Sequence, residues 1–342
     1  MRNGDFLKLK GKNRSSYVVE DLIPTNRLVL WASPPGEGKS LLGAYVMYSI
    51  AYNAECFGKK VTTGNVMFID SENRLDVLQS RAKKIKKGLE IAGHKKQDEV
   101  DFQHYTGFLL DDKSAWQKIE TIVKAIQPCL IMLDHLAQFH TQNENKASAM
   151  TKVANAIGDL MNMADASVLV MHHFNKYDIG SFLKRLRGSS SIYANCDVAC
   201  EIRSLSVNNG KLETVGIIPQ RRKDITPDAF RVRIKEGKDW LQIVHDGNYE
   251  PVDDPTLDIL AHKMYHVFLD PGNDEVTVNT MKAVVKGYAN DTEVRRCLAF
   301  MEHTRGLITS DRKGLGGGFH YVLPPSPVKY RQCPWCNQRV LC

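Results

Sequence analysis

The stretch Ser33-Pro34-Pro35-Gly36-Glu37-Gly38-Lys39-Ser40 decides the fold. It follows the apolar run Leu28-Val29-Leu30-Trp31 and opens a helical pattern that we expect to run from Lys39 to about Tyr52. A P-loop needs this strand–loop–helix context. Two glycines let the backbone curl so that its N–H groups point inward, and the helix N-terminus adds its dipole. The stretch therefore predicts a site for the phosphates of a nucleotide.

The residue types assign roles within this loop. Lys39 would reach the β- and γ-phosphates and Ser40 would ligate Mg²⁺, so ATP and Mg²⁺ are the expected cofactors. Ser33 stands where the pattern has its first glycine. The alternative is a Gly/Pro turn that holds a lysine by chance. The predicted nucleotide-binding residues are Ser33, Pro34, Pro35, Gly36, Glu37, Gly38, Lys39, Ser40 and Leu41.

Further apolar runs alternate with helical patterns up to about residue 205. Three of them predict strands, namely Asn65–Asp70, Leu130–Asp134 and Ala166–Met171, and a helix is expected from about Leu75 to Ala92. Near-continuous apolar runs are typical of parallel strands that are covered on both faces. Two more alternating stretches follow, 199–218 and 230–244, with a hairpin turn at Asn208-Asn209-Gly210. We predict an α/β domain with a doubly wound, mostly parallel sheet.

Asp134 ends the third apolar strand, counted from the one that begins at Leu28. At the carboxyl edge of a doubly wound sheet it would lie beside the P-loop and hold Mg²⁺ through water. The alternative is an aspartate that caps a turn or a helix.

Several segments resemble the RecA-like ATPases, in particular the DnaB-type and RepA-type hexameric replicative helicases. They are Phe68-Ile69-Asp70-Ser71-Glu72-Asn73, Phe139-His140 with Glu144-Asn145, Met171-His172-His173-Phe174-Asn175-Lys176, and Leu186-Arg187-Gly188-Ser189-Ser190-Ser191-Ile192 with Asp197-Val198. The resemblance covers roughly residues 17–235, and the segment Phe139-His140 with Glu144-Asn145 resembles the RepA branch most.

The resemblance implies roles for four residues. Glu72 matches the acid that activates the attacking water. His173 stands where DnaB-type helicases carry a glutamine that senses the γ-phosphate, and His172 would share that role, because an imidazole can donate to a phosphate oxygen. Arg222 is the best match for the arginine finger that a neighbouring subunit supplies, with Arg221 as a rival. The alternatives are a helix-start carboxylate, structural histidines and exposed loop bases.

The same resemblance implies a hexameric ring that threads single-stranded DNA past loops following the third and fourth strands. The second loop spans 176–187, and its predicted DNA contacts are Lys176, Lys184, Arg185 and Arg187. Positive charge in a loop flanked by Gly and Ser fits tracking of a phosphate backbone. The alternative is a solvated surface loop.

A shift to Pro and Asp around Tyr249–Pro255 predicts a domain boundary. We divide the chain into a basic arm (1–16), an ATPase domain (17–250), a winged-helix domain (251–325) and a Cys-containing tail (326–342). Three helices and two strands give the winged-helix order, with predicted DNA contacts at Arg295, Arg296, Arg312 and Lys313. Winged helices also dock proteins, so contact with duplex DNA and protein docking stay open.

The tail holds Cys333, Cys336 and Cys342. A Cys-x-x-Cys turn places two thiolates for tetrahedral Zn²⁺, with His320 or a ligand from another subunit to complete the site. The alternative is a flexible tail with free thiols.

Composition excludes other classes. The 342 residues are 43% hydrophobic and 25% charged, which is ordinary for a globular chain, with a net charge of +7. No apolar run reaches the roughly 18 residues of a membrane span, and no apolar segment follows the basic N-terminus as in a signal peptide. Five of the eight cysteines stand singly in apolar or helical contexts, so a reducing, cytoplasmic location is expected.

Three functions remain. The first is an ATP-hydrolysing DNA motor, a RepA/DnaB-like replicative helicase of a mobile element. The second is a recombinase-like or mediator ATPase without unwinding activity. The third is an ATP-gated DNA-binding regulator in which the winged helix recognises a sequence.

Overall fold

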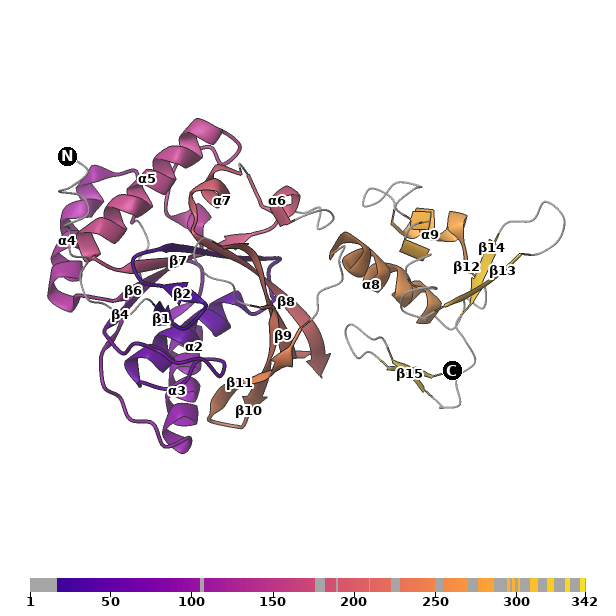
Figure 1. The fold of residues 1–342 in the computed structure, drawn as a ribbon, viewed down its shortest axis with the longest axis horizontal. Coiled ribbons are helices and arrows are strands. Elements are labelled where there is room, and N and C mark those ends of the chain that lie inside the picture. Colours follow the sequence, from indigo (N-terminus) through magenta and orange to yellow (C-terminus); the bar gives the residue numbers. More distant parts are fainter. Residues whose placement is uncertain are drawn as a thin grey trace, which may run out of the picture.

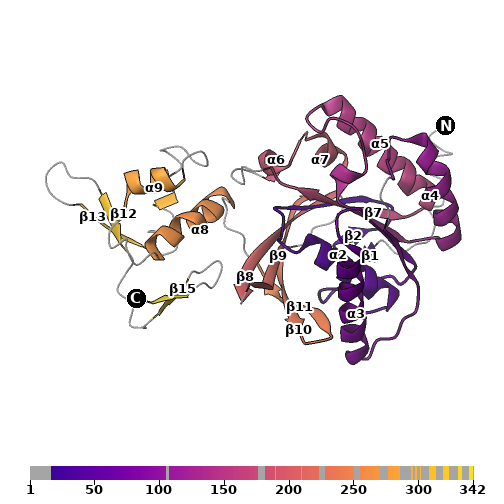
Figure 2. The same ribbon diagram turned by 180° about the vertical axis from the view of Figure 1, so that it is seen from behind.

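The structure is a computed structural model, shown in Figure 1 and from behind in Figure 2. It describes residues 17–104, 108–175, 182–188, 190–208, 210–222, 228–249, 255–269, 276–285, 294–295, 297–298, 301, 308–312, 319–322, 330–332 and 339–341. The predicted arm 1–16 lies outside these residues.

A nine-stranded sheet in the order β11-β10-β9-β8-β3-β7-β6-β4-β5 organises the larger part of the chain. Its strands are β3 (Leu28–Ser33), β4 (Val66–Asp70), β5 (Val100–His104), β6 (Leu130–Asp134), β7 (Ser167–His173), β8 (Val198–Asn208), β9 (Lys211–Arg222), β10 (Phe230–Glu236) and β11 (Leu241–Asn248). Six neighbouring strands of the sheet run parallel, in the order β8-β3-β7-β6-β4-β5. The strands β9, β10 and β11 continue the sheet in antiparallel pairing. A short hairpin of β1 (Tyr17–Val19) and β2 (Ile23–Pro24) precedes the sheet.

Helices cover both faces of the sheet, as Figures 1 and 2 show. The helices are α2 (Lys39–Ala51), α3 (Leu75–Ile91), α4 (Lys113–Ile126), η1 (Leu136–Gln138), α5 (Ala147–Ala164), α6 (Phe182–Arg185) and α7 (Ser191–Asn195). Side chains of α2 and α3 share one hydrophobic core with Val29 and Trp31 of β3, whereas α4 and α5 share the other with Leu28 and Leu30. Successive side chains of a strand point to opposite faces, so an apolar strand supplies both cores.

This architecture confirms the predicted doubly wound, mostly parallel sheet. The four expected parallel strands and the two helices start and end within two residues of the observed ones, whereas the alternating stretches expected at 199–218 and 230–244 extend four residues further, to the ends of β9 and β11. The strand β5 was not expected, because Val-Asp-Phe-Gln-His at the sheet edge alternates instead of forming an apolar run. Asp134 therefore ends the fourth parallel strand of the chain and not the third.

Residues after 250 have a hydrophobic core of their own, built around Leu260, Met264, Met281 and Leu298. Its elements are α8 (Pro255–Leu269), β12 (Val276–Thr277), α9 (Val278–Val284), β13 (Thr309–Arg312) and β14 (Phe319–Val322), with sheet order β12-β14-β13. The strand β12 was not expected. Only parts of the predicted third helix fall within the described residues. A last antiparallel pair joins β15 (Tyr330–Gln332) and β16 (Arg339–Leu341).

In the described part of the chain, no helix is both long enough and apolar enough to cross a bilayer.

Candidate nucleotide site

The P-loop connects β3 to α2 at the carboxyl edge of the parallel sheet. Gly36 and Gly38 have φ angles of +86° and +91°, a region that favours glycine, and Gly38 is the residue before the first turn of α2. A Cβ at Gly38 would lie 2.9 Å from Leu212 of β9. The backbone thus takes a curled path that a side chain at position 38 would disturb. The loop leads directly into α2, a helix of 13 residues. The positive end of the helix dipole therefore faces the loop.

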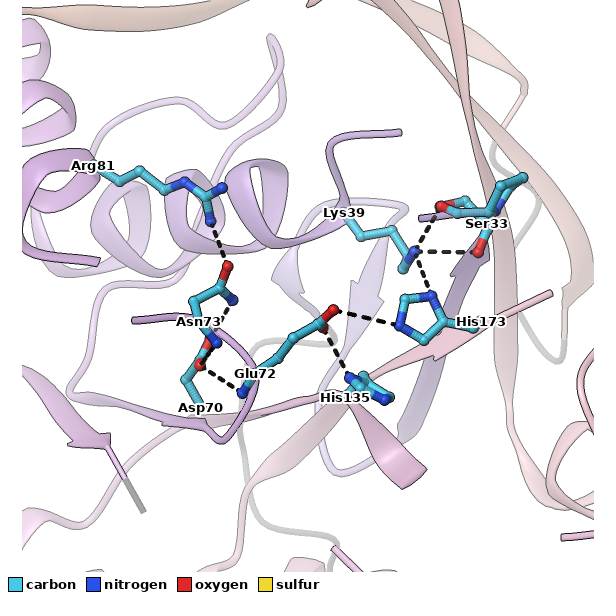
Figure 3. A network of polar contacts seen from close by, with 9 residues as sticks. Ser33, Lys39, Asp70, Glu72, Asn73, Arg81, His135 and His173 are labelled. Atoms are coloured by element: carbon cyan, nitrogen blue, oxygen red, sulfur yellow. Dashed lines mark hydrogen bonds and ion pairs between the residues drawn. The ribbon is translucent and has the colours of Figure 1, made fainter. Parts of the chain in front are cut away.

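Lys39 is buried, and its ammonium group lies against the start of the loop (Figure 3). Nζ donates to the Ser33 hydroxyl at 2.7 Å, to the Ser33 carbonyl at 3.2 Å and to the Pro34 carbonyl at 3.1 Å. The serine that replaces the first glycine of the motif therefore supplies a ligand for the lysine. Burial lowers the pKa of Lys39 to about 8, although the nearby carboxylates of Asp134, Glu72 and Glu37 oppose this effect.

The other loop residues have distinct environments. Pro35 and Gly36 are exposed, and Leu41 is partly buried. The carboxylate of Glu37 accepts a hydrogen bond from the backbone N–H of Ser204 in β8. This bond ties the tip of the loop to the neighbouring strand, a structural role that the sequence did not indicate.

Asp134 lies fully buried at the end of β6, in register with Asp70 at the end of β4. Neither of its carboxylate oxygens has a partner at hydrogen-bond geometry among the described residues. Burial raises the pKa of Asp134 to about 6; the nearby Ser40 hydroxyl opposes this rise, whereas the carboxylates of Asp70 and Glu72 add to it. A buried carboxylate without a partner is costly, and a cation would compensate that cost. The pair Ser40 and Asp134 therefore fits the predicted Mg²⁺ site.

Glu72 stands on a tight turn that follows β4. The Asp70 carboxylate accepts from the backbone N–H of Glu72 at 3.0 Å and from that of Asn73 at 2.7 Å. The Asn73 side chain donates to Asp70 at 2.8 Å and accepts from Arg81 of α3 at 3.3 Å (Figure 3). Asp70 thus fixes the backbone that carries Glu72, because an aspartate side chain readily closes such a turn on its own chain.

Two imidazoles face the Glu72 carboxylate. His135 Nδ1 lies 2.8 Å from Oε2, and His173 Nε2 lies 3.7 Å from Oε1. Hydrogen bonding, first from His135 and then from His173, holds the pKa of Glu72 far below its usual range, against the effect of burial. The carboxylate is therefore ionised at neutral pH, as a general base requires.

His173 links Glu72 to the P-loop. Its Nδ1 lies 3.4 Å from Lys39 Nζ. A lysine ammonium can only donate, so this contact favours the tautomer whose ring proton lies on Nε2, facing Glu72. Glu72, His135 and His173 offer ligand atoms within 4.8 Å of one another, a set that a transition metal could use. Because Lys39 favours the tautomer with a protonated Nε2, the cluster is better suited to hydrogen bonding than to metal ligation.

The prediction that His172 shares the phosphate-sensing role is wrong for this structure. His172 is 1% exposed and pairs in register with Ala32, whose side chain belongs to the core on the opposite face from α2. Its Nε2 donates to the Arg187 carbonyl at 2.9 Å, and burial lowers its pKa to about 4. Adjacent residues of a strand point to opposite faces, so only His173 faces the nucleotide site.

The basic residues after β7 separate into two kinds. Lys184 and Arg187 are exposed, and Arg187 pairs with Glu144 at 2.8 Å. Arg185 is 1% exposed and forms a two-point ion pair with the equally buried Glu201 of β8. The predicted DNA contact of Arg185 is therefore wrong for this structure, because no ligand reaches a side chain buried in this way.

Several predicted site residues fall wholly or partly outside the described residues. The backbones of Arg222 and Arg312 lie at the ends of β9 and β13, without a described side chain, and Arg295 is exposed. Those entirely outside the described residues are Lys176, Arg296, Lys313, Cys333, Cys336 and Cys342.

Sequence reasoning missed His135, which directly follows the strand-end aspartate in Leu133-Asp134-His135. The sequence signal that could have identified His135 is its place directly after a predicted strand, at the same sheet edge as Glu72. Which strand adjoins β6, however, is not visible in the sequence.

The sheet order, the curled P-loop and the carboxylates at the sheet edge define a P-loop ATPase built on a doubly wound, mostly parallel sheet. The family model for the AAA domain matches residues 6–178, and the chain belongs to that family. One solved structure that is similar is described as an ATPase domain, with 13% identity and a TM-score of 0.47 over 66% of this chain and 86% of that chain. No curated protein matches the sequence.

Proposed function

We propose that this ATPase is a DNA motor, a RepA- and DnaB-like replicative helicase of a mobile element that translocates on single-stranded DNA. In this proposal Lys39 binds the β- and γ-phosphates, Ser40 and Asp134 hold Mg²⁺, and Glu72 activates the attacking water. Bound Mg²⁺ would neutralise phosphate charge during the transfer. Arg222 of a neighbouring subunit in a hexameric ring would stabilise the transition state.

The observation that carries the proposal is the direct connection between the nucleotide site and a basic segment. The His173 carbonyl accepts from the Arg187 N–H at 3.1 Å, and the Asn175 N–H donates to the Arg185 carbonyl at 2.7 Å. The backbone that carries the exposed Lys184 and Arg187 is therefore held next to the strand end of His173, which faces Lys39 and Glu72. A change at the γ-phosphate position would reach groups suited to a DNA backbone over a few residues.

Steady-state ATP hydrolysis with and without single-stranded DNA tests the proposal, with Glu72→Gln as the matched inactive variant. We expect DNA to raise kcat severalfold, and Glu72→Gln to lower it by at least about 10³-fold while ATP binding persists, in keeping with the loss of a general base and its positioned water. A forked-duplex unwinding assay then separates a helicase from a translocase. Turnover that DNA does not change would contradict the motor.

The second candidate is the ATP-gated regulator, which the separate hydrophobic core after residue 250 and the exposed Arg295 favour. Duplex DNA binding through a winged helix at residues 251–325 would produce a sequence-specific footprint, and its affinity would change with ATP. A footprint combined with DNA-independent turnover would favour this candidate. Zinc bound by Cys333, Cys336 and Cys342 stays a proposal, which a metal assay of the purified chain tests.

A further inference from the structure

We propose that His135 is the positioning residue of this ATPase: it holds one oxygen of the Glu72 carboxylate so that the other stays directed at the reaction site. This inference rests on the proposed role of Glu72 as general base. His135 does not touch the nucleotide in this account and acts only through Glu72.

The first argument is the anchoring of His135 itself. It directly follows Asp134 at the end of the central strand β6, and its carbonyl accepts from the Gln138 N–H at 3.0 Å at the start of η1. Its side chain is 9% exposed, whereas that of Glu72 is 39% exposed. The imidazole is thus the fixed partner, and the glutamate is the side chain that needs fixing.

The second argument is the difference between the two imidazoles. His135 approaches Glu72 at 2.8 Å, within hydrogen-bond distance, and its ring makes no other polar contact among the described residues. His173 lies farther away, at 3.7 Å, and also faces Lys39 (Figure 3). The two rings meet edge to face with centroids 4.4 Å apart. His135 is therefore dedicated to Glu72, whereas His173 is shared between Glu72 and Lys39.

The third argument is that Glu72 is fixed at both ends. Asp70 holds its backbone N–H, and His135 holds its carboxylate. A glutamate has three side-chain torsions, so a fixed backbone alone leaves its carboxylate free to sample many positions. Catalysis by a general base needs the carboxylate within hydrogen-bond reach of the water, and a small displacement of the carboxylate lowers the reaction rate strongly. His135 restricts the end of the side chain that does the chemistry.

The experiment compares three substitutions of His135 in the full-length chain. His135→Ala removes the donor. His135→Asn places an amide nitrogen near the position of Nδ1, whereas His135→Gln places it near the position of Nε2, which faces away from Glu72. His94→Asn, three residues beyond the end of α3 that is opposite to Glu72, is the control for a histidine substitution away from the site. Thermal unfolding confirms that each variant folds, and a fluorescent ATP analogue measures nucleotide binding.

We expect His135→Ala to lower kcat on the order of 10²-fold, with KM and analogue affinity within about twofold, because only the positioning of the base is lost. His135→Asn should recover at least about tenfold of that loss, and His135→Gln should recover little. In the double variant His135→Ala/Glu72→Gln, kcat should equal that of Glu72→Gln, because removal of the base leaves nothing to position.

Four outcomes would overturn the inference. These are a His135→Ala enzyme with unchanged kcat, a loss confined to KM, equal activities for the Asn and Gln variants, or a further loss in the double variant. Failure of the proposed function looks different: DNA would then leave turnover unchanged, and if Glu72 is not the base, Glu72→Gln would turn over ATP at the rate of the unmodified protein. The two failures are therefore distinguishable in one set of assays.

Discussion

Arg185 provides the sharpest test of how the structure separates buried from exposed bases. It lies one residue from Lys184 in α6, yet its guanidinium is buried against the Phe174 ring, 4.3 Å from the ring centroid, and paired with Glu201. Arg203 also contacts Glu201, at 2.9 Å. Arg185→Met keeps most of the apolar volume and removes the charge, which leaves Glu201 buried with one arginine instead of two.

Breaking a buried ion pair by removing one partner costs about 3–5 kcal/mol. Because Arg203 still compensates Glu201, we expect the lower end, a loss of about 3 kcal/mol in the free energy of unfolding. For a domain of this size each kcal/mol corresponds to about 2–4 °C, so the melting temperature should fall by about 6–12 °C.

The assay is thermal and urea unfolding of Arg185→Met beside Lys184→Met, together with single-stranded DNA binding at two salt concentrations. Lys184 is exposed, so its variant should unfold within about 0.5 kcal/mol of the unmodified protein. Its DNA affinity should fall and lose part of its salt dependence. The reasoning is refuted if Arg185→Met unfolds like the unmodified protein and loses DNA affinity as Lys184→Met does.

Three further outcomes are expected. His172 has an ordinary pKa of 6.5 and a folded-state pKa of about 4, so its contribution to stability is present above pH 6.5 and is lost as the pH falls toward 4. Between pH 8 and pH 5 this loss is about 2 kcal/mol, and His172→Gln should remove that component from urea unfolding measured at both pH values. Gly88→Ala should destabilise by several kcal/mol in the same assay, because a Cβ would lie 1.9 Å from the Leu241 carbonyl oxygen. Gly43→Ala should cost only about 1–3 kcal/mol, because its Cβ would meet methionine methyl groups that can move. Equal losses for the two glycine variants would contradict this distinction.

The strongest sequence predictions concern features that are local in the chain. The P-loop, its helix and the strand-end position of Asp134 depend on residues that are neighbours in sequence, and apolar runs identify buried parallel strands directly. Glu72 was assigned through the resemblance of the segment Phe68–Asn73 to the RecA-like ATPases, and not from spacing alone. An edge strand such as β5, which alternates instead of running apolar, gives a weaker signal and was missed.

Contacts across the sheet depend on the strand order, which no local pattern contains. Strand β6 adjoins β4, so His135 meets Glu72 over a separation of 63 residues. Strand β3 lies between β7 and β8. Because side chains alternate between the two faces of β7, His173 points toward Lys39 and His172 points toward the opposite core. The same packing encloses Arg185 beside Glu201 and leaves Lys184 exposed.

The sequence by itself thus determined the P-loop ATPase class, the phosphate loop and the strand-end position of Asp134, because these require only short-range spacing. The tertiary structure decided which imidazole serves Glu72 and which arginine is available to a ligand. The physical reason is that burial and hydrogen-bond partners are properties of neighbours in space. The local sequence around a histidine or an arginine is the same whether the side chain binds a ligand or is buried and hydrogen-bonded inside the protein.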